Sequence, residues 1–151
     1  MYENIENLSL EDAYQILTQQ TKPLDSELIS PLQAAGRILA EDIIAPHDLP
    51  SYRQAAMDGF ALAETNSNRF LIKKHLEAGE VPSFTLKEGE AAGVVTGGHI
   101  PDGTAGVVRD EDVSVEDGYI FINSTNPQFN NIREQGEDFL AGTVIAKRGT
   151  K

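Results

Sequence analysis

Short apolar runs separated by turn residues fill the sequence after residue 50, and they restrict its fold more than any other feature does. The runs cover residues 59–63, 70–76, 81–86, 91–96, 106–109 and 119–122. Turn sequences rich in Gly and acidic residues separate several of them, at 87–90, 101–103 and 116–118. Six short strands with frequent turns predict a small all-β barrel or sandwich.

The sequence before residue 46 has a helical pattern instead. Ser9 followed by Asp12 approximates a capping box. The next apolar residues share one helical face: Leu10, Ala13, Ile16 and Leu17. Ser30 and Pro31 predict the N-cap and first residue of a second helix. Its buried stripe would consist of Leu32, Ala35 and Leu39.

Two prolines mark the change from the helical to the β pattern. Pro46 and Pro50 lie in an extended polar stretch that is typical of a domain crossing. Residues 141–146 predict one more strand, which we expect to return to the helical part and make that domain discontinuous. The chain stops soon after this strand, and we therefore expect it to be part of a longer protein.

Composition excludes several classes of function. The 151 residues allow one ordinary domain or two small ones. A net charge of −12 opposes binding to nucleic acid and to anionic membranes. The absence of cysteine excludes disulfides, Cys-based zinc sites and thiol nucleophiles, and fits a cytoplasmic protein. The sequence has neither an apolar stretch of membrane-spanning length nor the start of a signal peptide.

Three glycine-anchored clusters contain the candidate site residues: cluster 1 (55–61), cluster 2 (94–103) and cluster 3 (131–138). In cluster 1, Asp58 could hold a metal, orient a hydroxyl or act as a base. An Asp-Gly pair alone nevertheless favours a turn aspartate that bonds its own backbone.

The other two clusters also have a structural and a chemical interpretation. In cluster 2, residues 96–98 could offer backbone N–H groups to an oxyanion, but their sequence alone favours a hairpin turn. In cluster 3, Arg133 could clamp a phosphate, and Glu137 with Asp138 could bind a hard cation. A charged surface turn with local ion pairs is the favoured interpretation of cluster 3 alone.

The three histidines show no metal-ligand spacing. His47, His75 and His99 are far apart in the sequence, and no nucleophile-elbow motif accompanies them. We therefore interpret all three as structural or exposed.

The combination of the three clusters in this order is far more specific than any one of them. Together they resemble the N-terminal part of the MoeA/gephyrin family, from about Leu10 to the C-terminus. The resemblance implies an α+β fold, in which an elongated discontinuous domain (1–45 plus 137–151) carries an inserted small all-β barrel-like domain (46–136). It also implies a homodimer with its cleft between subunits.

The activity implied by the resemblance is the insertion of molybdenum from molybdate into adenylylated molybdopterin, with release of AMP in a magnesium-dependent step. Asp58, Thr96 and Asp138 would be catalytic residues lining the cleft. The expected substrate-binding residues are Gly97, Arg133 and Glu137. The resemblance assigns no metal ligands in this chain, and it implies magnesium and molybdate only for the family's reaction.

Local departures from the family pattern leave a second hypothesis open. Residues 53–55 are Arg-Gln-Ala where the family usually has Asp-Asn-Ser, and Glu134-Gln135 replaces a common basic pair. Gly98-His99 replaces a common Ala-Pro. Less positive charge weakens the attraction of an anionic substrate. The chain is thus either part of a molybdenumtransferase, expected to be inactive alone, or a non-catalytic binding or assembly module of the same fold.

Overall fold

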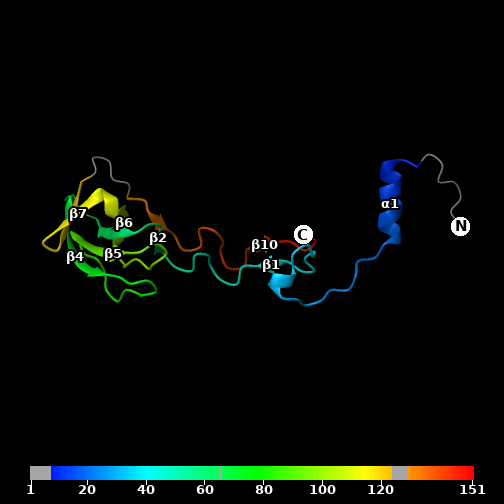
Figure 1. Ribbon diagram of the computed structural model, residues 1–151, viewed down its shortest axis with the longest axis horizontal. Helices are drawn as coiled ribbons and strands as arrows, with labels where there is room; N and C mark the ends of the chain where they lie inside the picture. The colour runs from blue at the N-terminus through cyan, green and yellow to red at the C-terminus, as the bar shows by residue number, and fades with distance from the viewer. Residues whose placement is uncertain (1–7, 65, 124–128) are drawn as a thin grey trace. The chain divides into compact units, whose positions relative to one another are not determined.

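A computed structural model describes residues 8–64, 66–123 and 129–151 of the chain (Figure 1). The pattern of contacts between Cα atoms divides the chain into two compact units. The first consists of residues 1–41 with 148–151, and the second of residues 42–147. The strands that carry the candidate site all belong to the second unit.

The first unit contains the predicted N-terminal helix. Helix α1 spans Leu10–Gln20, and the hydroxyl of Ser9 accepts a hydrogen bond from the backbone N–H of Asp12 at 3.1 Å. This confirms the capping interpretation of Ser9. The apolar face of α1 is open, because Leu10 is 81% exposed and no described residue of α1 is buried.

The prediction of a second helix is wrong. Only a single 3₁₀ turn forms, η1 (Pro31–Gln33), although Ser30 caps it as expected. Gly36 adopts a left-handed φ of +80°, which an α-helix cannot continue. The chain end returns within this unit, where Leu39 donates to the carbonyl of Thr150 at 2.8 Å.

The final strand pairs with a short strand close to the start of the second unit. Strand β10 (Val144–Ala146) is antiparallel to β1 (Ile43–Ile44). A strand within residues 141–146 is therefore confirmed, and its partner is β1 rather than the helix.

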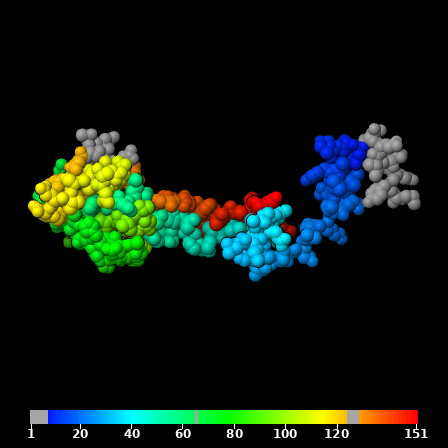
Figure 2. Space-filling view, in the orientation of Figure 1, coloured from blue at the N-terminus to red at the C-terminus, as the bar shows by residue number. Residues whose placement is uncertain are grey.

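A six-stranded mixed sheet forms the body of the second unit, seen as one packed mass of green and yellow atoms in Figure 2. Its strands are β3 (Gly59–Ala63), β4 (Arg69–His75), β5 (Glu90–Val94), β6 (Thr104–Arg109), β7 (Val113–Glu116) and β8 (Tyr119–Ile122). The spatial order is β6-β3-β5-β4-β8-β7, and only the β4–β5 pair is parallel.

Five of the six predicted strands are confirmed, with shifts of one or two residues at some ends. The predicted strand at 81–86 is wrong, since only an isolated bridge between Thr85 and Asp102 forms there. Pro82 lacks the N–H that a sheet ladder needs. Strand β7 was not predicted, because its two valines alternate with polar residues directly after three acidic ones.

The mostly β character of the chain is confirmed, but the sheet does not close into a barrel. In the described part of the chain, β6 and β7 are the two edges of the sheet and do not pair with each other. Residues 129–130 cover part of the β6 edge, where the N–H of Val107 donates to the carbonyl of Phe129 at 3.0 Å.

Both faces of the central strand β3 are buried, and this fixes the position of the site. Ala61 and Ala63 belong to one core, while Phe60 and Leu62 belong to the core on the other face. Asp58 directly precedes β3 and, with Phe60, lines an open groove. Its exposed carboxylate is therefore attached to one of the most rigidly packed strands of the unit.

No helix in the described ranges is both long and apolar enough to cross a membrane.

Candidate functional site

A short strand brings the three glycine-anchored clusters together. Strand β2 (Gln54–Ala55) pairs antiparallel with β9 (Ile132–Arg133), which belongs to cluster 3. The N–H of Ala55 also donates to the carbonyl of Gly98 at 3.0 Å, and the N–H of Gly97 donates to the carbonyl of Ala55 at 2.8 Å. Clusters 2 and 3 are thus both anchored to the segment that leads into Asp58.

Asp58 and Thr96, both predicted as site residues, are in direct contact. One carboxylate oxygen of Asp58, Oδ1, accepts hydrogen bonds from the backbone N–H and from the hydroxyl of Thr96, each at 2.7 Å. The backbone bond first, and then the hydroxyl, hold the pKa of Asp58 below its ordinary value. The site therefore presents an ionised, exposed carboxylate in a fixed orientation at neutral pH.

Removal of the Thr96 hydroxyl should raise the pKa of Asp58. In Thr96→Val the backbone bond remains, so we expect the pKa to move part of the way back to its ordinary value. A lowered folded-state pKa contributes stability above the unfolded-state pKa, and this is lost as the pH falls through the folded-state pKa. The variant should lose part of that contribution. A carbon-detected NMR titration of the Asp58 carboxyl measures the shift, with Thr18→Val in α1 as the control. An unchanged pKa would contradict the assigned hydrogen bond.

The Thr-Gly-Gly sequence of cluster 2 forms a turn, as its sequence alone favours. The N–H of Gly98 donates to the carbonyl of Val95 at 2.9 Å. The N–H groups of Thr96 and Gly97 are also occupied, by Asp58 and Ala55. All three backbone donors of this turn are used within the protein, which disfavours the oxyanion interpretation.

Cluster 3 forms a compact ion-pair network. The Nε of Arg133 donates to Glu137 at 2.6 Å, and its Nη2 donates to both carboxylate oxygens of Asp138, at 2.7 and 2.6 Å. The hydrogen bond to Glu137, followed by that to Asp138, raises the pKa of Arg133. The same bond to Arg133 lowers the pKa of Glu137. An anion or a cation at cluster 3 would therefore compete with these internal pairs.

The predicted site residues thus form two groups that β2 connects. Asp58 and Thr96, with Gly97 next to them, form one group, and Arg133, Glu137 and Asp138 form the other. Asp48 ties the chain on both sides of the second group together, since it accepts hydrogen bonds from the side chain of Gln135 at 2.8 Å and from the N–H of Ala141 at 2.9 Å. Within the described ranges, no three His, Asp or Glu side chains are placed to hold a metal ion.

Two side-chain contacts next to β2 were not predicted from the sequence. Arg53 forms a bidentate ion pair with Glu134, at 2.8 and 3.1 Å, directly beside the end of the β2–β9 ladder. The ring of Tyr52 stacks on His99, with centroids 3.5 Å apart, and its hydroxyl donates to the carbonyl of Gly97 at 3.2 Å. Residues 53 and 134 both depart from the family pattern, and their opposite charges compensate each other. These opposite charges were the one signal in the sequence that could have indicated the contact.

Exchange of the charges at residues 53 and 134 should reveal their coupling. Arg53→Glu or Glu134→Arg alone brings two like charges together and should lower the thermal midpoint. The double variant restores an ion pair and should recover most of the loss. Because both side chains are largely exposed, we expect a coupling of about 1 kcal/mol or less. Thermal unfolding of the four proteins measures it, and additive effects would contradict the pair.

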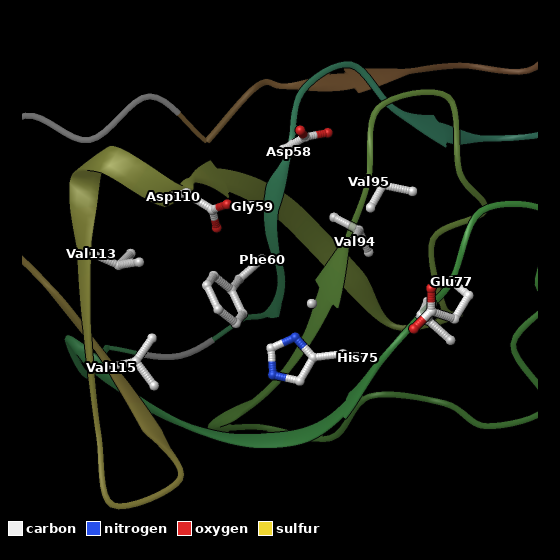
Figure 3. A pocket seen from close by; sticks show the side chains of 12 residues that line it. Asp58, Gly59, Phe60, His75, Glu77, Val94, Val95, Asp110, Val113 and Val115 are labelled. Carbon is white, nitrogen blue, oxygen red and sulfur yellow. The ribbon is translucent and has the colours of Figure 1, made fainter.

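An open groove of about 470 Å³ begins at Asp58 and continues over one face of the sheet (Figure 3). Phe60, His75, Val113 and Val115 line it, together with the acidic residues Glu77 and Asp110. The imidazole of His75 is packed against Gly93, where a Cβ atom would overlap the ring. His75 is therefore a packed residue of the groove wall.

The second unit is thus a mostly β domain in which an aspartate next to a buried strand is hydrogen-bonded to a threonine of a glycine-rich turn. The family described as the MoeA N-terminal region (domain I and II) matches residues 8–151. The chain belongs to this family, and the sequence-based recognition is confirmed.

Known relatives agree with this assignment. A molybdopterin molybdenumtransferase of Staphylococcus epidermidis is 30% identical over 95% of the chain and 36% of its own length. A relative of the same description from Synechococcus elongatus is 35% identical over 85% of the chain and 34% of its own length. The crystal structure of the molybdopterin biosynthesis moeA protein from Pyrococcus horikoshii OT3 superposes with a TM-score of 0.81 at 28% identity, over 91% of the chain and 39% of that protein. The chain therefore spans little more than a third of each of these proteins.

Proposed function

We propose that this chain is the N-terminal part of a molybdopterin molybdenumtransferase. In this proposal it contributes half of an intersubunit site at which molybdenum from molybdate is inserted into adenylylated molybdopterin, in the cytoplasm. The observation that carries the proposal is the Asp58 carboxylate, which two donor groups of Thr96 fix at the end of a buried strand. Family membership supports the choice of reaction.

Each predicted site residue has a role in this proposal. Asp58 is ionised and exposed, so its carboxylate can accept a hydrogen bond from a substrate hydroxyl and orient that group. Thr96 holds Asp58 in place and keeps it ionised. Asp138 is the third catalytic residue of the proposal. Gly97, Arg133 and Glu137 would contact the anionic substrate, which must loosen the ion pairs of cluster 3 as it binds.

The carboxylate pair of cluster 3 does not fit magnesium as it stands. Arg133 holds both Glu137 and Asp138, so neither carboxylate is free to bind a cation. We therefore assign no step of the chemistry to magnesium in this chain. Molybdate and adenylylated molybdopterin enter the proposal as substrates only.

The proposal includes the domain organisation and the assembly. We propose that residues 46–136 form an insertion in a discontinuous domain of residues 1–45 and 137–151, and that the protein is a homodimer. A homodimer would allow the two halves of a site to come from different subunits.

A non-catalytic binding or assembly module is the second candidate. The observation that favours it is the neutralised guanidinium of Arg133, which leaves cluster 3 without a free positive charge for an anionic substrate. The overall charge of −12 points in the same direction.

A chimera separates the two candidates. Residues 8–151 would replace the matching segment of the Staphylococcus epidermidis relative, and the chimera would be expressed in cells that lack their own molybdenumtransferase. We expect it to restore the activity of a molybdenum-dependent enzyme. A folded chimera that restores none, beside a parent that does, would favour the binding module.

A further inference from the structure

The groove beside the open edge of the sheet has the features of a peptide-binding surface. Phe60, only 5% exposed, forms part of its floor, and the ring of His75 meets that of Phe60 edge to face with centroids 5.7 Å apart. Val113 and Val115 of β7 lie across from these rings (Figure 3). The space of about 470 Å³ between them is sufficient for one long side chain with its flanking backbone.

The charge of the groove is one-sided. Three of the residues lining it are acidic, namely Asp58, Glu77 and Asp110, and none is a lysine or an arginine. Arg109, the nearest arginine in sequence, pairs with Glu111 at 3.0 Å and with Asp112 at 2.9 Å, so it does not neutralise Asp110. A groove with an apolar floor and an acidic rim selects a cationic side chain that has an apolar stem.

Strand β7 provides a backbone edge next to this groove. It is the last strand of the sheet order, and in the described part of the chain no strand pairs with its outer side. Its sequence, Val-Ser-Val-Glu, contains neither the proline nor the lysine that commonly blocks an edge. Val115 is 58% exposed although it is apolar and lines the groove. An extended peptide can pair with such an edge and place alternate side chains in an adjoining pocket.

We propose that β7 and the groove bind an extended segment of a partner protein, which adds a strand to the sheet and seats an arginine side chain in the groove. The carboxylate of Asp110, on the β7 side of the groove, would receive the guanidinium, whose plane can stack on the imidazole of His75 (Figure 3). Glu77, at the other end of the groove, adds negative charge. Arginine fits better than lysine because its planar head matches both the ring and a carboxylate. This inference does not depend on the proposed enzymatic function.

Peptide titrations of the 151-residue chain test the proposal. The probe is an acetylated and amidated Thr-Val-Arg-Val-Thr peptide, and its control has Glu in place of Arg. Amide NMR shifts should change for residues 113–116 and for Gly93 on addition of the arginine peptide. The glutamate peptide should bind about tenfold more weakly or not at all.

Two variants test the groove itself. Val115→Lys places a cation at an exposed position in the groove and should abolish binding without unfolding the chain. The double variant Glu77→Gln with Asp110→Asn should weaken binding of the arginine peptide about fivefold or more. Glu88→Gln, in an exposed turn outside the groove, is the matched control and should bind like the unaltered chain.

Several outcomes would overturn the proposal. Equal binding of the two peptides would exclude charge selection, and shifts confined to α1 would place the surface elsewhere. Absence of shifts with the arginine peptide at about 5 mM would exclude the site at any useful affinity. Shifts of residues 113–116 that depend on protein concentration alone would identify a second copy of the chain, and not another protein, as the occupant.

Discussion

Replacement of Asp58 by alanine is expected to lower the rate of molybdenum insertion by the chimera about 100-fold or more. The change removes the carboxylate that Thr96 holds with both its N–H and its hydroxyl. Because Asp58 is exposed, the thermal midpoint should change little. A rate assay with purified substrates, together with thermal unfolding, measures both effects.

Asp102→Ala is the matched control for this prediction. Asp102 is also an exposed aspartate of the glycine-anchored clusters, but it makes no described contact with Thr96. It should keep a rate close to that of the unaltered chimera. Equal rates for Asp58→Ala and Asp102→Ala would remove Asp58 from the site.

Gly59→Ala is expected to have the largest effect on stability. A Cβ atom at this position would overlap the carbonyl oxygen of Val108, which belongs to the neighbouring strand β6. Both strands are buried and cannot separate without opening the sheet. We expect a loss of about 3 kcal/mol or more in the free energy of unfolding, measured by urea denaturation.

Gly97→Ala distinguishes this packing effect from a general effect of glycine replacement. Gly97 has a φ of +76°, but a Cβ atom there would meet no atom within 4 Å. Gly97→Ala should therefore lower the free energy of unfolding by only about 1 kcal/mol, the usual penalty for an alanine in the left-handed region. A Gly59→Ala protein as stable as Gly97→Ala would contradict the close approach of β3 and β6.

Local sequence was sufficient to predict α1 and most strands of the sheet. Ser9 determines where α1 begins through a contact with Asp12, only three residues away. The run at 59–63 is apolar throughout because both faces of β3 are buried. The prediction of the second helix failed because Gly36 adopts a left-handed conformation, which ends a helix regardless of the apolar spacing around it.

The candidate site was only partly accessible from the sequence. The resemblance selected Asp58 and Thr96, and their contact explains why two residues 38 positions apart belong together. The ion pair of Arg53 with Glu134 and the stacking of Tyr52 on His99 depend on the pairing of β2 with distant segments. A short strand of two residues leaves no periodic pattern, so neither contact could be predicted.

Molybdenum insertion by the purified chimera tests the central claim most directly. Molybdate and adenylylated molybdopterin would be supplied, and the release of AMP would be followed together with the molybdenum content of the product. If residues 8–151 supply a working half of the site, the rate should lie within about tenfold of the Staphylococcus epidermidis parent. A chimera that folds and binds adenylylated molybdopterin as tightly as the parent, yet releases no AMP above the buffer control, would contradict the account.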